Sequence, residues 1–190
     1  MNSAGKLEAA MRSNRVYRRQ DLERFSTAVD RNLKNLVKSG VVKKLSGGLY
    51  YRPLKNVFGA APPNERDLVR AFLKTDNFLI TSYNNYNQLG LGLSQIYNFD
   101  IVYNHRRTGR HELGGKRFDF RIVPEYPRKL SKEYILVDLL NNFARLPDNT
   151  SSVFDNLKSR QNYFNLARLH YCVKEYAKPR AKKMVKELYD

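Results

Sequence analysis

The chain has 190 residues, of which 35 are Lys or Arg and 18 are Asp or Glu, so its net charge at neutral pH is +17. It contains no run of about 18 apolar residues that could span a bilayer, its first residues lack the apolar core of a secretory signal, and its one cysteine, Cys172, excludes an internal disulfide framework and a cysteine-rich zinc site. We therefore expect a cytoplasmic protein with no membrane partner, and the charge favours a polyanion, because Lys and Arg that neutralise phosphates release condensed counterions.

The positive charge is concentrated in residues 1–60, which hold 13 Lys or Arg and 4 Asp or Glu. The apolar pattern there predicts, in order, a short helix over 4–13, an extended segment over 15–19, a second short helix over 19–25 and a third helix after it. Ser26 and Thr27 are expected to cap the third helix, and Ser39-Gly40 to end it. Residues 41–45 and 49–53 predict two strands, joined at Ser46-Gly47-Gly48, where glycine allows positive backbone angles.

The third helix has two different faces. Its apolar face carries Val29, Leu33, Leu36 and Val37, and the opposite, mostly basic face carries Asp30, Arg31, Lys34, Asn35 and Lys38. Three helices followed by a basic hairpin are the order of a winged helix-turn-helix domain. In such a domain the third helix enters the major groove and the hairpin touches the DNA backbone or the minor groove.

DNA contacts are assigned by side-chain chemistry. Arg31 and Asn35 suit base edges, since Arg pairs with guanine and Asn with adenine through two hydrogen bonds. The full set of expected DNA-binding residues is Thr27, Arg31, Lys34, Asn35, Lys38, Lys43, Lys44, Arg18 and Arg19, with the lysines and the last two arginines as phosphate contacts. Two alternatives remain open: the hairpin only closes a small core above a solvated helix face, or the domain binds another protein.

Residues 61–190 predict a different kind of structure. After Pro62-Pro63, Asn64 is expected to cap a helix over 65–75. The following elements are expected: a helix and turn over 81–95 with Tyr83, Tyr86 and Leu89 three residues apart, strands over 99–105 and 116–123 with a basic loop or hairpin extension between them, and helices over 132–146, 162–177 and 179–190. In the helix over 162–177, Leu166, Leu169, Val173 and Tyr176 are expected to share one face. The predicted fold class is α+β: an N-terminal winged helix-turn-helix over 1–60, then a small α/β unit and a C-terminal helical segment over 61–190.

Several stretches together resemble a known family. In order they are "GGLYYRP", "YNQLGLGLSQ", "IVYNHRRTGRHELGGKRFDFRIVP", "LSKEYILVDLLNN" and "YAKPRAKKMVKEL". They resemble the AbiEi antitoxins of bacterial type IV toxin-antitoxin and abortive-infection systems, which act in phage defence. The resemblance implies a non-enzymatic protein whose winged helix represses its own operon, through residues 31–38 and the wing at 43–48. It also implies that residues 61–190 counteract a nucleotidyltransferase toxin encoded beside it.

An enzyme finds little support in the sequence. His105, His111 and His170 have no second ligand at metal spacing, and Cys172 lies in an apolar helix where a buried, inert thiol is expected. "LGGKRF" lacks the spacing of a phosphate-binding loop, and Asp119 is expected to be an exposed acid between buried aromatic residues. We therefore predict no catalytic residue, no metal and no cofactor.

A basic loop in the middle of the chain raises the alternative of an RNA-binding module without a toxin partner. Arg106, Arg107, Arg110, Lys116 and Arg117 lie near Tyr103, Phe118 and Phe120. If Phe118, Phe120 and Ile122 point inward as alternate strand residues, only a basic rim remains, and Arg106, Arg107 and Arg110 are then candidate toxin-neutralising residues. A stand-alone DNA-binding regulator is a further alternative, and DNA binding by a dimer or by cooperating monomers stays open.

Overall fold

The computed structural model describes residues 3–57, 59–146 and 151–189, and its fold is mixed α+β. The chain forms two compact units: Met1–Asn77 with Arg110–Phe118, and Phe78–Gly109 with Asp119–Asp190. We call them the first and the second unit. The first unit thus extends beyond the predicted 1–60 segment and is discontinuous in sequence. No helix in the described ranges is long and apolar enough to cross a membrane.

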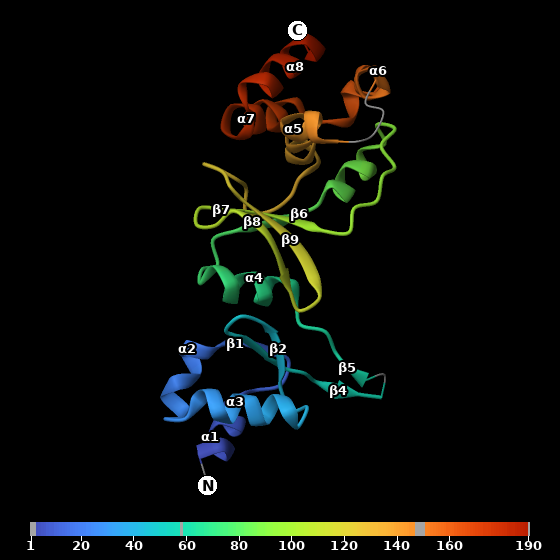
Figure 1. Ribbon diagram of the computed structural model, residues 1–190. Helices are drawn as coiled ribbons and strands as arrows, with labels where there is room; N and C mark the ends of the chain where they lie inside the picture. The colour runs from blue at the N-terminus through green and yellow to red at the C-terminus, as the bar shows by residue number, and fades with distance from the viewer. Residues whose placement is uncertain (1–2, 58, 147–150, 190) are drawn as a thin grey trace. The chain divides into compact units, whose positions relative to one another are not determined.

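The first unit begins with short helices and a three-stranded sheet of order β1-β3-β2, in which both neighbouring pairs are antiparallel (Figure 1). Its elements run in the order α1 Ser3–Ala10, β1 Arg15–Arg18, α2 Arg19–Leu22, the 3₁₀ turn η1 Glu23–Phe25, α3 Val29–Lys38, β2 Lys43–Ser46 and β3 Leu49–Arg52. The helices, the extended segment and the hairpin that the sequence predicts in this region are confirmed.

Helix α3 supplies much of the core of the first unit. Its apolar side chains pack with those of α1 and α2; the buried cluster consists of Leu7, Met11, Leu22, Val29, Leu33, Leu36 and Val42. The helix stops where Gly40 turns to a φ of 72° and donates its N–H to the carbonyl of Val37 at 3.1 Å, which confirms the predicted end.

The predicted capping of α3 by Ser26 and Thr27 is wrong. Ala28 is the N-cap residue, and no side chain caps the helix. The buried hydroxyl of Ser26 instead accepts the N–H of Ala28 at 3.1 Å and the side-chain amide of Asn32 at 2.8 Å. Ser26 therefore lies two residues before the N-cap, too early to reach the first turn, and it fixes the preceding bend instead.

The turn of the β2-β3 hairpin lies at Gly47-Gly48, where Gly48 has a φ of 74°, as the sequence predicts for this turn. The carbonyl of Gly48 accepts the backbone N–H of Arg19 at 2.8 Å. This hydrogen bond joins the tip of the hairpin to the start of α2.

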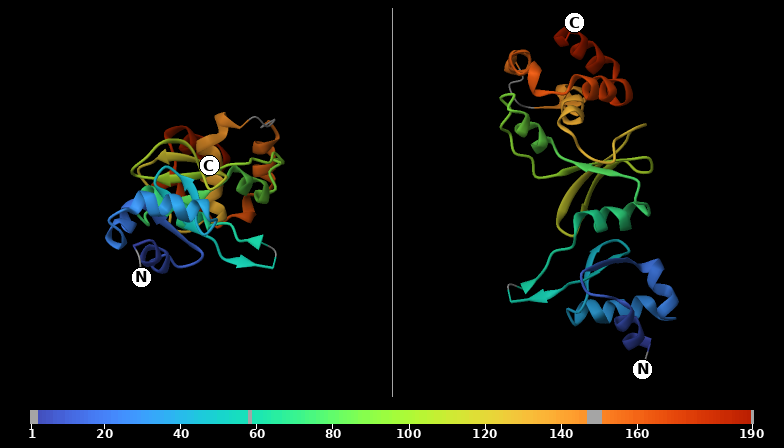
Figure 2. Two further views of the ribbon diagram at one scale, coloured as in Figure 1. Left: turned by 60° about the horizontal axis from the view of Figure 1, so that its bottom comes forward. Right: turned by 180° about the vertical axis from the view of Figure 1, so that it is seen from behind.

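The segment after Pro53 contains a hairpin that the sequence did not predict. Strands β4 Lys55–Asn56 and β5 Gly59–Ala60 pair antiparallel, and the hairpin extends away from the helices of the first unit (Figures 1 and 2). The next helix, α4 Glu65–Leu73, begins as predicted: the Asn64 side chain accepts the N–H of Arg66 at 2.9 Å.

Residues 110–118 complete the first unit with the end of a third hairpin. Strands β8 Gly109–Leu113 and β9 Lys116–Ile122 form the predicted basic hairpin extension. The N–H of Gly114 donates to the carbonyl of Leu45 at 3.2 Å, and Lys116 pairs with Glu65. Gly114 has a φ of 61°, and a Cβ there would lie 3.2 Å from the side chain of Leu45, so a larger residue would strain this contact.

The second unit combines a sheet with helices gathered on one side of it (Figures 1 and 2). The strands form the order β6-β7-β9-β8, of which β6 and β7 pair antiparallel. In this sheet, β8 from Arg110 on and β9 up to Phe118 belong to the first unit. Its further elements are β6 Leu79–Thr81, the 3₁₀ helix η2 Tyr83–Leu89, β7 Asp100–Asn104, α5 Lys132–Asn142, η3 Phe143–Arg145, α6 Ser151–Ser159, η4 Gln161–Tyr163, α7 Leu166–Tyr176 and α8 Pro179–Tyr189. The sequence predicted all of these regions except β6 and α6.

Two apolar patterns of the second unit differ in outcome. Tyr83, Tyr86 and Leu89 are all buried, because a spacing of three matches the three residues per turn of the 3₁₀ helix that they occupy. In α7 the predicted face is only partly right: Leu169 and Cys172 are buried, but Leu166 is 51% exposed. The buried arc is centred between Leu169 and Cys172, which leaves Leu166 at its edge on the first turn.

Candidate functional site

The polar face of α3 and the neighbouring strand β2 carry the densest group of predicted DNA contacts. Thr27, Arg31, Lys34, Asn35, Lys38, Lys43 and Lys44 are all exposed. Arg31 and Asn35 lie four residues apart, as do Lys34 and Lys38, so each pair shares one side of the helix. Within the described part of the chain, no ion pair or side-chain hydrogen bond engages the four lysines or Arg31. Their donors are therefore available to a ligand.

The two arginines before α2 are engaged within the protein. Arg18 makes a two-point contact with Asp21, at 2.8 and 2.6 Å. Arg19 makes a similar contact with Asp30 of α3, at 2.5 and 2.6 Å, and also pairs with Glu23. These hydrogen bonds raise the pKa of both arginines, and the Arg19 guanidinium lowers the pKa of Asp30. Arg18 and Arg19, predicted as phosphate contacts, thus hold carboxylates.

Arg19 has a specific consequence for the α3 face. Asp30 is the acidic residue on that otherwise basic face, and its charge is balanced by Arg19. The same arginine, through its backbone N–H, contacts the tip of the β2-β3 hairpin. Arg19 therefore links α3 to the tip of the hairpin and neutralises the Asp30 carboxylate.

The residues of the predicted toxin-neutralising loop are divided between the two units. Asn104 Oδ1 accepts the backbone N–H groups of Arg106 and Arg107, each at 2.7 Å, and fixes the turn after β7 in the second unit. Arg110 lies on β8 and belongs to the first unit. All three side chains are exposed.

The predicted inward orientation of three alternate β9 residues is partly confirmed. Phe118 and Phe120 are each 1% exposed, as expected, and so are not available to stack on bases. Ile122 is 53% exposed, which corrects the prediction, because it is the last residue of the strand.

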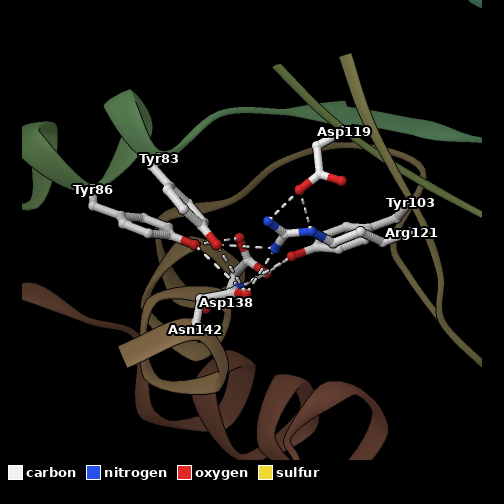
Figure 3. A network of polar contacts seen from close by, with 7 residues as sticks. All are labelled: Tyr83, Tyr86, Tyr103, Asp119, Arg121, Asp138 and Asn142. Carbon is white, nitrogen blue, oxygen red and sulfur yellow. Dashed lines mark hydrogen bonds and ion pairs between the residues drawn. The ribbon is translucent and has the colours of Figure 1, made fainter. Parts of the chain in front are cut away.

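The second unit contains a buried polar network (Figure 3). At its centre is Asp138 of α5, which accepts the hydroxyl of Tyr103 at 2.6 Å and that of Tyr86 at 2.8 Å. Asn142, one turn later, donates to the hydroxyl of Tyr103 at 3.1 Å and to the Asp138 carboxylate at 3.2 Å. The network therefore ties η2, β7 and α5 together.

Arg121 extends the network to β9. It donates to the Tyr83 hydroxyl at 2.9 Å and to Asn142 Oδ1 at 3.0 Å, and it makes an ion pair with Asp119 at 2.6 Å (Figure 3). Asp119 and Arg121 are alternate residues of one strand and so share a face of the sheet. The prediction that Asp119 is an exposed acid is wrong: its side chain is 15% exposed, because Arg121 compensates its charge.

Burial governs the protonation of the network. Removal from water raises the pKa of Asp138 in spite of its two tyrosine donors and of the nearby Arg121 and Lys178. Burial and the Asp138 carboxylate raise the pKa of Tyr86 and of Tyr103 as well. For Arg121, burial acts to lower the pKa, but the bonds to Tyr83 and Asp119 raise it overall. The tyrosines therefore stay neutral and the arginine charged at physiological pH, as suits a structural network.

A cavity of about 590 Å³ adjoins this network within the second unit. Tyr103, Arg121, Asp138 and Asn142 line it from the network, and Tyr134 and Tyr176 from the helices. Sequence reasoning missed Asp138 and Asn142, because the surrounding helix was interpreted as uniformly apolar. Two polar residues four positions apart in an otherwise apolar helix are the signal that would have found them.

The residues weighed for catalysis or metal binding lie apart. His105 stacks on Tyr126 with ring centroids 4.9 Å apart, His111 lies 4.8 Å from Phe72, and His170 is exposed on α7. No group of three or more His, Cys, Asp or Glu in the described ranges is arranged to hold a metal ion. Cys172 is buried, as predicted, and burial raises the pKa of its thiol.

Comparisons with known proteins give a match in structure. No protein-family model and no curated protein sequence matches the chain. The fold is similar to the crystal structure of the RV2827C protein from Mycobacterium tuberculosis. The TM-score is 0.58 and the sequence identity 15%, over 97% of this chain and 74% of that one. At this identity the likeness shows a common fold and nothing about function.

If the α3 face binds duplex DNA, as the sequence predicts, Arg19→Ala is expected to weaken that binding more than Arg24→Ala does. Both changes remove one positive charge, but only the first leaves Asp30 on the α3 face without its partner, where its carboxylate would repel the phosphates of a bound duplex. Fluorescence anisotropy measures the two affinities. The double variant Arg19→Ala/Asp30→Asn should bind better than Arg19→Ala, and equal affinities of the two would contradict the role assigned to Arg19.

The raised pKa of Asp138 predicts a pH dependence of stability. The folded chain holds this proton more tightly than the unfolded chain, so ionisation of Asp138 lowers the free energy of unfolding as pH rises above about 4. Asp138→Asn cannot ionise. The free energy of unfolding of Asp138→Asn minus that of the wild type, measured by urea titration, should therefore increase with pH. Glu187→Gln, which makes the same change in net charge at the surface, is the control. A constant or decreasing difference would contradict the assignment.

Proposed function

We propose that the first unit is a winged helix that binds double-stranded DNA, with α3 in the major groove and the β2-β3 hairpin as the wing. The observation that carries the proposal is the α3 face with β2, where exposed Arg31, Asn35 and lysine side chains combine base-reading and phosphate-binding chemistry. The element order from α1 to β3 and the sheet order β1-β3-β2 support it, because a winged helix places its wing beside its third helix in this way.

The resemblance to the AbiEi family extends the proposal from DNA binding to biology. The chain would be a non-enzymatic, cytoplasmic antitoxin that represses its own operon and counteracts a nucleotidyltransferase toxin. In that arrangement the first unit binds the operator, and the second unit acts on the toxin or on its effect. Repression by two copies on an inverted repeat, as a dimer or as cooperating monomers, suits such an operator.

Sequence-specific DNA binding has a direct test. The chain should bind DNA from immediately upstream of its own gene more tightly than a scrambled duplex of equal length in a fluorescence anisotropy titration. Arg31→Ala/Asn35→Ala should abolish this preference and keep the salt-sensitive, nonspecific binding, because base contacts carry the specificity. Each loss of about 1–3 kcal/mol per base contact is measurable as about 5- to 150-fold in affinity.

Lys43→Ala and Lys44→Ala are the matched comparison, since they remove phosphate contacts. Each should weaken binding to both duplexes equally and lower the slope of log affinity against log salt by about 0.9. Equal, weak binding of the wild type to both duplexes, unchanged by Arg31→Ala/Asn35→Ala, would make the first unit a scaffold.

Toxin counteraction is tested in cells that express the nucleotidyltransferase encoded beside the gene. Co-expression of the wild-type chain should restore growth. The triple variant Arg106→Glu/Arg107→Glu/Arg110→Glu should abolish this protection if the loop faces the toxin, because it reverses three exposed charges. Full protection by the charge-reversed chain would show that the neutralising surface lies elsewhere, and no protection by the wild type would refute the antitoxin proposal.

A further inference from the structure

Positive charge in the last third of the chain is concentrated at its C-terminal end. Residues 158–189 hold nine Lys or Arg and two Asp or Glu, whereas residues 125–157 hold four and five. All nine cations are exposed: Lys158, Arg160, Arg168, Lys174, Lys178, Arg180, Lys182, Lys183 and Lys186. Such a density of exposed cations in one stretch of the chain creates a positive potential that attracts polyanions.

Helix α8 separates its apolar and basic residues cleanly. It buries Ala181, Met184, Val185 and Leu188. At about 100° per residue, Lys182, Lys183 and Lys186 occupy the opposite arc. Lys183 lies 3.9 Å from Glu187, but both side chains are mostly exposed, at 81% and 63%, so this pair is weak and a phosphate can replace the carboxylate.

Helix α7 adds an exposed aromatic ring between cations. Tyr171 is 58% exposed, and Arg168 and Lys174 lie three residues before and after it, on the same side of the helix. The ring meets Tyr176 edge to face, with centroids 6.2 Å apart and an interplanar angle of 83°. Because an edge-to-face contact covers at most one face of one ring, Tyr171 keeps a face open to solvent.

We propose that the exposed residues of α7 and α8 bind single-stranded RNA, with the lysines on phosphates and Tyr171 stacked on a base. The lysines alone would bind any polyanion. The exposed ring of Tyr171 between two cations can in addition stack on a base that is not already stacked, while the cations bind the neighbouring phosphates. The loops, bulges and ends of RNA present this combination, whereas the bases of a duplex are stacked inside it. This activity is separate from the DNA binding proposed for the first unit and does not depend on it.

The test uses the full chain and fluorescence anisotropy with three labelled probes. They are a single-stranded RNA of about 12 nucleotides, the single-stranded DNA of the same sequence, and a scrambled DNA duplex. The wild type should bind the RNA with a Kd in the range of about 1–100 µM at physiological salt. No detectable RNA binding in this range, or tighter binding of the single-stranded DNA than of the RNA, would overturn the proposal.

Two triple variants with the same change in net charge separate the surfaces. Lys182→Glu/Lys183→Glu/Lys186→Glu should weaken RNA binding by about tenfold or more and leave duplex DNA binding within about twofold. Arg31→Glu/Lys34→Glu/Lys38→Glu on α3 should do the reverse. If both variants weaken RNA binding equally, the effect is one of total charge and the α8 surface is not the site.

Tyr171 distinguishes base stacking from simple charge attraction. Tyr171→Ala should weaken RNA binding about fivefold or more without changing its salt dependence, and Tyr171→Phe should restore the wild-type affinity, because stacking needs the ring and not the hydroxyl. An unchanged affinity in Tyr171→Ala would refute RNA as the ligand. Circular dichroism checks that these surface variants stay folded. Because the duplex DNA probe reports on the first unit, failure of the DNA-binding proposal can be distinguished from failure of the RNA-binding proposal.

Discussion

The packing of the second unit depends on the hydrogen bonds that two tyrosine hydroxyls donate to the buried carboxyl group of Asp138. A carboxyl group this deeply buried is stable only when hydrogen bonds replace the water that it has lost. Tyr86 and Tyr103 supply these bonds from η2 and β7, and Asn142 and Arg121 link the same group to β9. Removal of one member would leave its buried neighbours with fewer hydrogen bonds, so the network favours one arrangement of these elements over others.

Arg19 has the corresponding role in the first unit, but at the surface. It joins α2 to α3 through Asp30 and to the β2-β3 hairpin through its backbone. Because the ion pair is exposed, it determines the charge that α3 presents to a ligand more than it determines stability. Both units thus contain an ion pair between an arginine and a carboxylate. In the second unit the pair belongs to a buried network, and in the first unit it sets the charge of the α3 surface.

The spacing of apolar residues in the sequence predicted the elements that bury one face and expose the other. The apolar face of α3, the three-residue spacing of Tyr83 and Tyr86, and the glycine turn of the hairpin all follow from local geometry. Partnerships between distant residues were not predictable in this way. Nothing local shows that Arg19 meets Asp30. The Asp119–Arg121 pair is local, since the two residues share one face of β9, but the alternation of apolar and polar residues does not show that the pair is largely buried. The cap assigned to Ser26 failed because Ser26 lies two residues before the N-cap Ala28, and its hydroxyl therefore reaches a different N–H.

The discontinuity of the first unit has a consequence for synthesis on the ribosome. Leu45 accepts a hydrogen bond from Gly114 and Glu65 pairs with Lys116, and both partners lie on a hairpin that is translated some fifty or more residues later. The α3 surface can therefore form early, but the unit that carries it is complete only after residue 118 has emerged. A nascent chain stopped before that point would present the basic helix on its own apolar cluster but without the contacts of Leu45 and Glu65 to the later hairpin. Completion of the first unit thus requires translation of residues 78–109, which belong to the second unit.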